Sequence, residues 1–190
     1  PWLQGSSEWA VEVALPANAD AARARPTQLR LTSNLIGTAI KLPPPLGKPA
    51  GEALAADVRI PMPVDGGDVD VVLGRRIALR AQNRAGRTGI RAQLGATAIT
   101  GAVPAHGLVV EGRTGEVDAL SWAGFASSRG SGGGSGAGIG PVRIDVQAER
   151  LLLLGQRYAN TRLKLAPVTG GNRVQVEGNG ISGNLDIPNA

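Results

Sequence analysis

The stretch VRIDVQAE, residues 142–149, alternates between apolar and polar side chains. Val142, Ile144 and Val146 occupy every second position, and charged or amide side chains occupy the positions between them. A period of two is the spacing of a β-strand, because successive side chains of an extended chain point to opposite faces. The stretch therefore predicts a strand in a sheet with one apolar face and one hydrated face.

The same alternation recurs along most of the chain. The further alternating segments are WAVEVAL (9–15), QLRLT (28–32), LAADVRIPM (54–62), RIALRAQ (76–82), GIRAQLG (89–95), TRLKLAP (161–167), NRVQVEG (172–178) and NLDIP (184–188). Turn-forming clusters such as DGGD, NRAG, TGGN and EGNG separate them. The pattern predicts an all-β fold built on one long antiparallel sheet of ten or more strands, with little helix between them.

One stretch, EVDALSWAGFASS, departs from the alternation. Asp118 can cap a helix in which Leu120, Trp122 and Phe125 follow near-helical spacing, so we predict one short helix near 118–127. Its aromatic side chains are expected to anchor packing. The next stretch, SSRGSGGGSGAGIG at 127–140, has the composition of a flexible loop. It leads into Pro141 and a strand, whereas a dinucleotide-binding fingerprint opens a helix.

Composition excludes several classes of function. The formal charge of the 190 residues is +5, but the basic residues are scattered and only 3% of the chain is aromatic, which argues against a nucleic-acid partner. The chain has no cysteine, so it has neither disulfides nor a thiolate metal site. No apolar run approaches the roughly 18 residues of a membrane span. Because the chain begins with Pro1 and runs almost directly into strand-like sequence, we interpret it as a piece of a longer protein.

Catalytic and metal-binding patterns are not found. The single histidine, His106, lies in a turn context, and no GxSxG motif surrounds a serine. Asp65, Asp68 and Asp70 in DGGDVD lack the rest of a calcium-binding loop and are better explained by a hairpin turn. We predict no catalytic residues, no metal and no cofactor. A polysaccharide hydrolase has no motif in its favour, and the chain is expected to present a surface and not an active site.

The stretch NLIGTAIKLPPPLGKPA, residues 34–50, joins an alternating segment to a proline run. Ile36, Ile40 and Leu42 are expected to form a strand that contributes to the apolar face. The prolines at 43–45 end hydrogen bonding and keep the chain extended, and Lys48 is expected at the hydrated rim. The prolines are not spaced three apart, so an SH3-type ligand is not indicated.

With Ser33 in front, this stretch resembles the proline-containing signature of the YhdP-type branch of the AsmA-like proteins. The similarity extends to Trp2 and Trp9, to GLVVEGRTGEVDALSW (107–122) and to the closing GNLDIP (183–188). The resemblance implies a protein anchored in the inner membrane of Gram-negative bacteria that spans the periplasm. It also implies a curved, taco-like β-sheet whose hydrophobic groove conducts phospholipids towards the outer membrane and maintains the permeability barrier of the envelope.

On this interpretation, residues 1–190 form a single β-groove section of a longer bridge protein. Its partners would be phospholipid acyl chains, the rest of the bridge, and proteins of the periplasm or outer membrane. The expected groove lining consists of Val11, Val13, Leu29, Leu31, Ile36, Ile40, Val58, Ile60, Ile77, Leu79, Ile144, Val146, Leu163, Leu165, Val174 and Val176.

A second interpretation remains open at this point. The same alternation suits a closed β-sandwich or a solenoid that acts as a structural or adhesive module, with the apolar face forming a dry core and no lipid path. Alternation alone barely separates the two interpretations. They differ in whether the apolar face is open.

Overall fold

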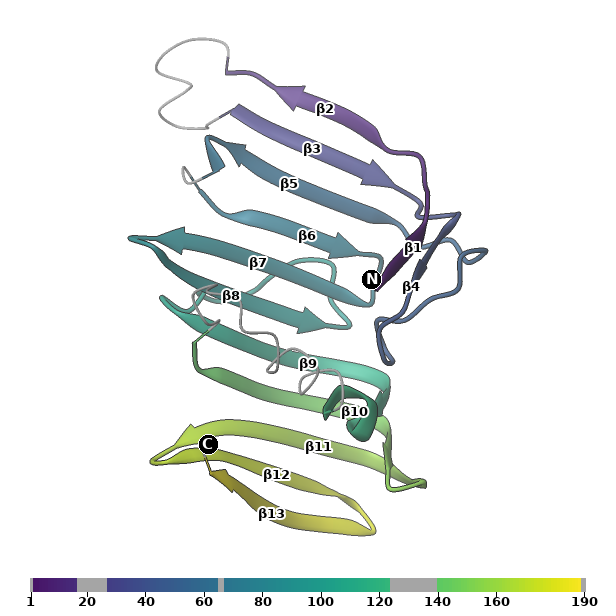
Figure 1. Ribbon diagram of the computed structural model, residues 1–190, viewed down its shortest axis with the longest axis vertical. Coiled ribbons are helices and arrows are strands. Elements are labelled where there is room, and N and C mark those ends of the chain that lie inside the picture. Colours follow the sequence, from purple (N-terminus) through teal and green to yellow (C-terminus); the bar gives the residue numbers. More distant parts are fainter. Residues whose placement is uncertain (1, 17–26, 65–66, 124–139, 189–190) are drawn as a thin grey trace.

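The computed structural model describes residues 2–16, 27–64, 67–123 and 140–188, which fold into a large β-sheet and a small one (Figure 1). In the small sheet, β1 (Leu3–Gly5) pairs with β4 (Thr38–Ile40). The strands of the large sheet are β2 (Ala10–Ala14), β3 (Thr27–Ser33), β5 (Ala56–Met62), β6 (Val69–Leu73), β7 (Ile77–Arg84), β8 (Arg87–Leu94), β9 (Gly107–Asp118), β10 (Val142–Leu153), β11 (Gln156–Val168), β12 (Gly171–Asn179) and β13 (Ile181–Pro188). The predicted all-β fold is confirmed.

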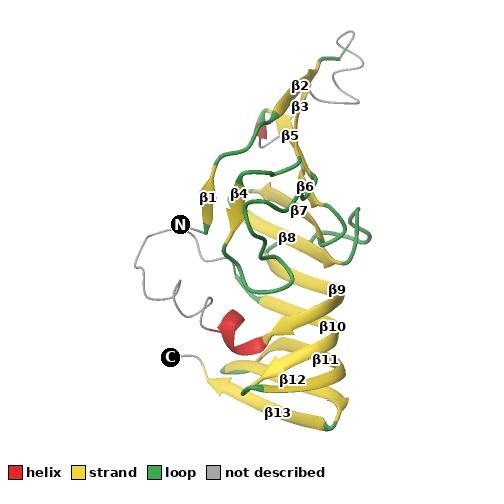
Figure 2. Ribbon diagram, turned by 90° about the vertical axis from the view of Figure 1, so that its right-hand side faces the viewer, coloured by secondary structure: helices red, strands yellow, loops and turns green. Residues whose placement is uncertain are grey.

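The large sheet has eleven strands in the order β13-β12-β11-β10-β9-β8-β7-β6-β5-β3-β2. Since β2 and β13 stand at opposite edges, the sheet does not close into a barrel. Figure 2 shows that β1, β4 and a short helical turn all lie on the same side of this curved sheet. The molecule is therefore a long open sheet, covered in part on one face.

Strand β9 is parallel to both of its neighbours, β8 and β10, whereas the other pairs of the large sheet are antiparallel. Parallel neighbours need a crossover connection, and residues 95–106 provide it between β8 and β9. The sequence did not reveal this mixed character, because an apolar and polar alternation looks the same in both kinds of pair.

The pairing registers align the alternating apolar residues across the whole sheet. We call the longest alignment the central row. It consists of Val11, Leu31, Val58, Val71, Leu79, Ala92, Val110, Ile144, Leu165, Val174 and Leu185, one residue from each strand. Because directly paired residues point to the same side, these side chains share one face of the sheet, the apolar face.

A second alignment, the flanking row, runs beside the central row on the same face. It contains Ala56, Leu73, Ile77, Leu94, Gly112, Val146, Leu163, Val176 and Gly183. Much of it is buried: Ile77, Leu94 and Val146 belong to the main hydrophobic cluster of the molecule. A smaller cluster consists of Ala56, Ile40, Leu35 and Leu54.

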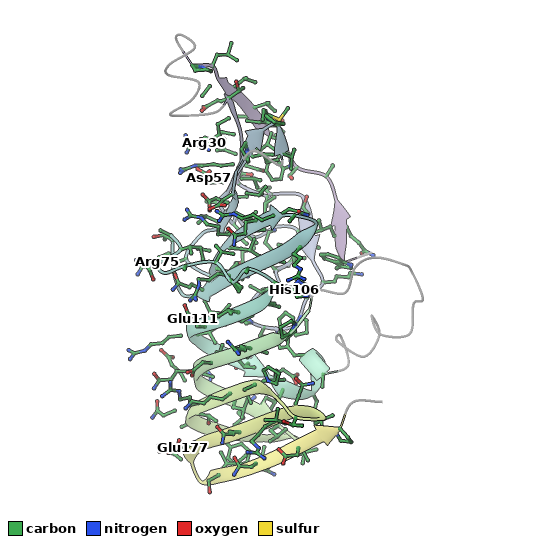
Figure 3. The ribbon with its side chains drawn as sticks, turned by 90° about the vertical axis from the view of Figure 1, so that its left-hand side faces the viewer. Arg30, Asp57, Arg75, His106, Glu111 and Glu177 are labelled. Atoms are coloured by element: carbon green, nitrogen blue, oxygen red, sulfur yellow. The ribbon has the colours of Figure 1, made fainter. Side chains whose placement is uncertain are left out.

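The opposite face is polar and is crossed by ion pairs between neighbouring strands. The pairs are Arg30–Asp57, Arg80–Asp70, Arg91–Glu111, Arg162–Asp145 and Arg173–Asp186. Figure 3 shows Arg30, Asp57, Glu111 and Glu177 projecting from this side of the sheet. The 95–106 crossover also lies here, since Arg91 Nε donates to the carbonyl of Ala102 at 2.6 Å. These arginines thus lie on the hydrated face of the sheet, where they pair with carboxylates of neighbouring strands.

The predicted short helix is present as a helical turn at 119–123, directly after β9. Asp118 caps it as expected, because its Oδ1 accepts from the backbone N–H of Ser121 at 2.9 Å. These hydrogen bonds lower the pKa of the Asp118 carboxyl. Phe125 and, apart from Gly140, the predicted loop at 127–140 lie outside the described residues.

Candidate functional site

The apolar face is the candidate functional site, and it is most exposed at the two edges of the sheet. At one edge, Val11 and Val13 in β2 have exposed fractions of 61% and 58%. At the other edge, Leu185 and Ile187 in β13 have 61% and 45%. Between the edges, most of the central row is half-buried. Large aliphatic side chains thus meet solvent at both ends of a continuous apolar strip.

Fourteen of the sixteen residues predicted to line a groove lie on the apolar face. Seven belong to the central row, four to the flanking row, and Val13, Leu29 and Ile60 form a third alignment beside them. The remaining two lie outside the large sheet. Ile40 is buried in the small cluster around β4, and Ile36 is 50% exposed in the turn before β4. Whether any of these residues contacts a lipid stays a prediction.

Four members of the central row were missing from the predicted lining: Val71, Ala92, Val110 and Leu185. Val71 and Val110 each lie next to a second valine, so the local pattern does not say which of the two faces inward. Ala92 and Leu185 lie in cleanly alternating segments, so the sequence pattern was sufficient to place them on the apolar face. Strand pairing resolves all four, because each is in register with a residue already assigned.

Residues 41–55, which join β4 to β5, form a loop that we call the proline strap. It folds back on β4: Lys48 N donates to the carbonyl of Ile40 at 3.0 Å, and Ile40 N donates to the carbonyl of Lys48 at 2.9 Å. Gly47 permits this reversal, because a Cβ there would lie 2.3 Å from the carbonyl oxygen of Leu42. The strand expected from Ile36, Ile40 and Leu42 is present only as β4, which pairs with β1 and not with the large sheet. Ile36 lies in the turn before it, and Leu42 lies in the strap.

Lys48 is buried, with an exposed fraction of 4%, so its predicted place at the hydrated rim is also wrong. Its Nζ donates to the carbonyl of Thr38 at 2.6 Å and to that of Pro49 at 2.9 Å. Carbonyl oxygens replace water around the buried ammonium group, which is the condition under which a charged side chain tolerates burial. The lysine ties the strap to β4.

The tip of the strap reaches the main hydrophobic cluster, which holds part of the flanking row. Leu46, near its tip, packs against the main hydrophobic cluster, as does Trp122 of the helical turn. The indole Nε1 of Trp122 donates to the carbonyl of Pro44 at 2.7 Å. At the base of the strap, Arg76 donates to the carbonyl of Gly47 at 2.6 Å. The strap and the helical turn thus pack on the cluster that holds Ile77, Leu94 and Val146 of the flanking row, and the central row lies beside it.

Within the described residues, no group of three or more acidic, histidine or cysteine side chains is arranged to hold a metal ion. His106 lies just before β9, at the turn expected for it, and Gly140 approaches its ring closely. No described helix is long and apolar enough to cross a bilayer. A shallow hollow of about 350 Å³ lies on the polar face, lined in part by Arg143, Lys164 and Arg173. It is open to solvent and lies on the opposite side of the same strands from the apolar strip.

A protein-family model described as YhdP protein matches residues 1–190, which is the full length of the chain. No curated protein and no solved structure matches it. The match covers the strap, the helical turn and all strands of both sheets.

Proposed function

The chain belongs to the YhdP family, and from this premise we propose that its apolar face conducts phospholipids by their acyl chains. Membership of this transport family suggests a role in envelope lipid transport and argues against an enzyme. We propose further that the chain is a section of a periplasmic bridge, anchored in the inner membrane, that carries phospholipids towards the outer membrane and so maintains the permeability barrier.

The central row is the observation that carries this proposal. A dry core needs to be covered everywhere, whereas this row runs from edge to edge and ends in the exposed Val11 and Leu185. The second interpretation, a closed sandwich or solenoid module, requires a second layer over the whole face. The small sheet and the strap cover the flanking row over the middle of the sheet and leave the edges exposed.

The energetics of lipid transfer favour such a surface. Exposing acyl methylenes to water costs roughly 0.8 kcal/mol each, so two chains of about sixteen carbons cost on the order of 25 kcal/mol. A continuous aliphatic strip removes most of this cost without any catalytic group. The headgroup can remain in water at the open side of the groove.

The proposal is tested by placing one charge on either face of the same strand in the full-length protein. Val174 belongs to the central row, and its neighbour Gln175 in β12 points to the polar face. We expect Val174→Glu to reduce lipid supply to the outer membrane by about tenfold, because a carboxylate in the strip adds a desolvation barrier for each acyl chain. Gln175→Glu, which adds the same charge one residue away, is expected to behave as wild type.

A photo-crosslinking amino acid at Leu31 or Leu165 supplies the direct measurement. Both residues lie in the central row, on opposite sides of the strap. Capture of phospholipid in cells at both positions is the expected result. If neither position captured lipid while the protein was expressed and folded, the transport proposal would be rejected in favour of a structural module.

A further inference from the structure

The proline strap is anchored differently at its two ends. At the base, Lys48 Nζ donates to the carbonyls of Thr38 and Pro49, and Arg76 both donates to the carbonyl of Gly47 and pairs with Glu52. These are charge-assisted contacts, made within the strap, to β4 and to the β6–β7 turn. The base of the strap is therefore fixed to the part of the sheet from which it departs.

The tip is held by contacts of another kind. There the neutral Trp122 indole donates to the carbonyl of Pro44, and Leu46 packs against the main cluster. Trp122 lies 78 residues further along the chain, on the turn that follows β9. A neutral hydrogen bond contributes less net stability than a charge-assisted one. The hydrogen bond at the tip is therefore weaker than the charge-assisted ones at the base.

The strap covers one row of the apolar face. Ile77 and Leu94 of the flanking row are buried beneath this region, while Leu79 in the same strand as Ile77 belongs to the half-buried central row. Alternate residues of a strand lie about 6.6 Å apart. Removing the tip from the flanking row would widen the uncovered strip by about that distance.

We propose that the proline strap is a gate on the apolar face, latched by the Trp122–Pro44 hydrogen bond, whose release uncovers the flanking row for the second acyl chain of a diacyl lipid. This inference rests on the proposed lipid-conducting function and proposes how the passage of lipid is regulated. With the hydrogen bond formed, an acyl chain passing the strap can contact the central row alone. With the hydrogen bond broken, it can also contact Ile77, Leu94 and their neighbours.

The test locks the tip in the full-length protein. Because residues 1–190 contain no cysteine, the pair Pro44→Cys and Trp122→Cys introduces the only thiols in this region. A short bis-maleimide with a reducible linker then joins the tip of the strap to the helical turn. The matched control joins the base in the same way, through Glu52→Cys and Arg76→Cys, which replace an existing ion pair. Photo-crosslinkers at Leu31 and Leu165 report lipid on either side of the strap.

We expect the tip crosslink to reduce lipid captured on the far side of the strap by about tenfold, because a locked gate removes the open population. Reduction of the linker should restore capture, and the base crosslink should leave it unchanged. Equal capture on both sides with the tip locked would overturn the gate while leaving the transport function intact. Absence of capture in the wild-type protein would instead count against the transport function itself.

A second variant keeps the test decisive if the cysteine pair folds poorly. Trp122→Phe retains a packed ring and removes the N–H that binds Pro44. A gate predicts that lipid capture at Leu31 and Leu165 stays the same or rises, since the latch is weakened. A fall in capture, with the protein level unchanged, would mean that the strap is a fixed supporting wall, and the gate would be rejected.

Discussion

At the scale of single residues, Lys48 shows how the environment of a charge overrides its sequence context. A lysine beside prolines in a turn is expected in water, yet this one is 4% exposed and satisfied by backbone carbonyls. Its neighbour Lys41, on the same strap, is exposed. The two lysines therefore differ: Lys41 is exposed to water, and Lys48 holds the strap to β4.

We predict that Lys48→Met lowers the free energy of unfolding by about 1.5–3 kcal/mol, because two buried carbonyls lose a charged donor. Lys41→Met is the matched control and should change stability little, since exposed side chains away from special contacts have small effects. Urea denaturation followed by circular dichroism measures both. Equal stability of the two variants would show that the Lys48 hydrogen bonds do not support the strap.

At the scale of elements, the polar face joins neighbouring strands through arginine–carboxylate pairs. Between β10 and β11, Arg162 donates to both oxygens of Asp145, at 2.6 and 2.7 Å. These hydrogen bonds hold the pKa of Asp145 below its usual value. Arg30, across on β3, and to a smaller extent Arg59, in the same strand, do the same for Asp57. Each such pair is half-exposed, so its contribution is modest and depends on salt.

The lowered pKa of Asp145 sets the direction of a pH effect. A carboxyl whose pKa is lower in the folded state contributes stability above its unfolded value, here 3.8, and loses it as the pH falls through the folded value. Asp145→Asn should therefore unfold at lower urea than wild type at pH 7. The difference should shrink as the pH is lowered below about 4. Glu149→Gln, an exposed change in the same strand, should show no comparable convergence.

Much of the large sheet follows from sequence because its strands alternate cleanly. QLRLT and NRVQVEG assign their inward residues without structural help, and the registers agree with them. The pattern fails where backbone geometry changes locally. Ala148 and Leu151 are three residues apart and are both 1% exposed, which period two does not allow. In the adjacent strand, Asn160 has a φ of 49°, a local change that residue types do not announce.

The prediction for the segment around β4 and the strap failed for a different reason. Ile36, Ile40 and Leu42 alternate like a strand of the main sheet, but β4 pairs with β1 and packs its apolar side onto that sheet. Periodicity gives the face of an element and not its partner. The role of Trp122 depends on its contact with Pro44, 78 residues earlier in the chain, for which one sequence holds no signal.

At the scale of the whole molecule, the edge strands β2 and β13 present aliphatic side chains, and no described strand pairs with their outer sides. Natural sheets blunt such edges with lysine, proline or bulges, because an open edge templates pairing with another chain. β2, with the sequence AVEVA, has neither lysine nor proline. Taken as a separate unit, residues 1–190 should therefore self-associate through this edge.

We predict that Val13→Lys reduces this self-association, because a charge on the apolar face of the edge strand opposes stacking in water. Gln28→Lys is the control, since Gln28 pairs with Ala14 beside this site but lies on the polar face. Sedimentation velocity over a concentration series compares the two. If both lysines had the same effect, net charge and not the apolar edge would govern association.

The length of the central row determines how many lipids the strip can hold at once. Neighbouring strands lie about 4.8 Å apart, so ten steps from Val11 to Leu185 cover about 48 Å. One leaflet of a bilayer has a hydrocarbon depth of about 15 Å, half of the full core. The strip is thus about three acyl-chain lengths long, and a lipid at one edge leaves room for others behind it in single file.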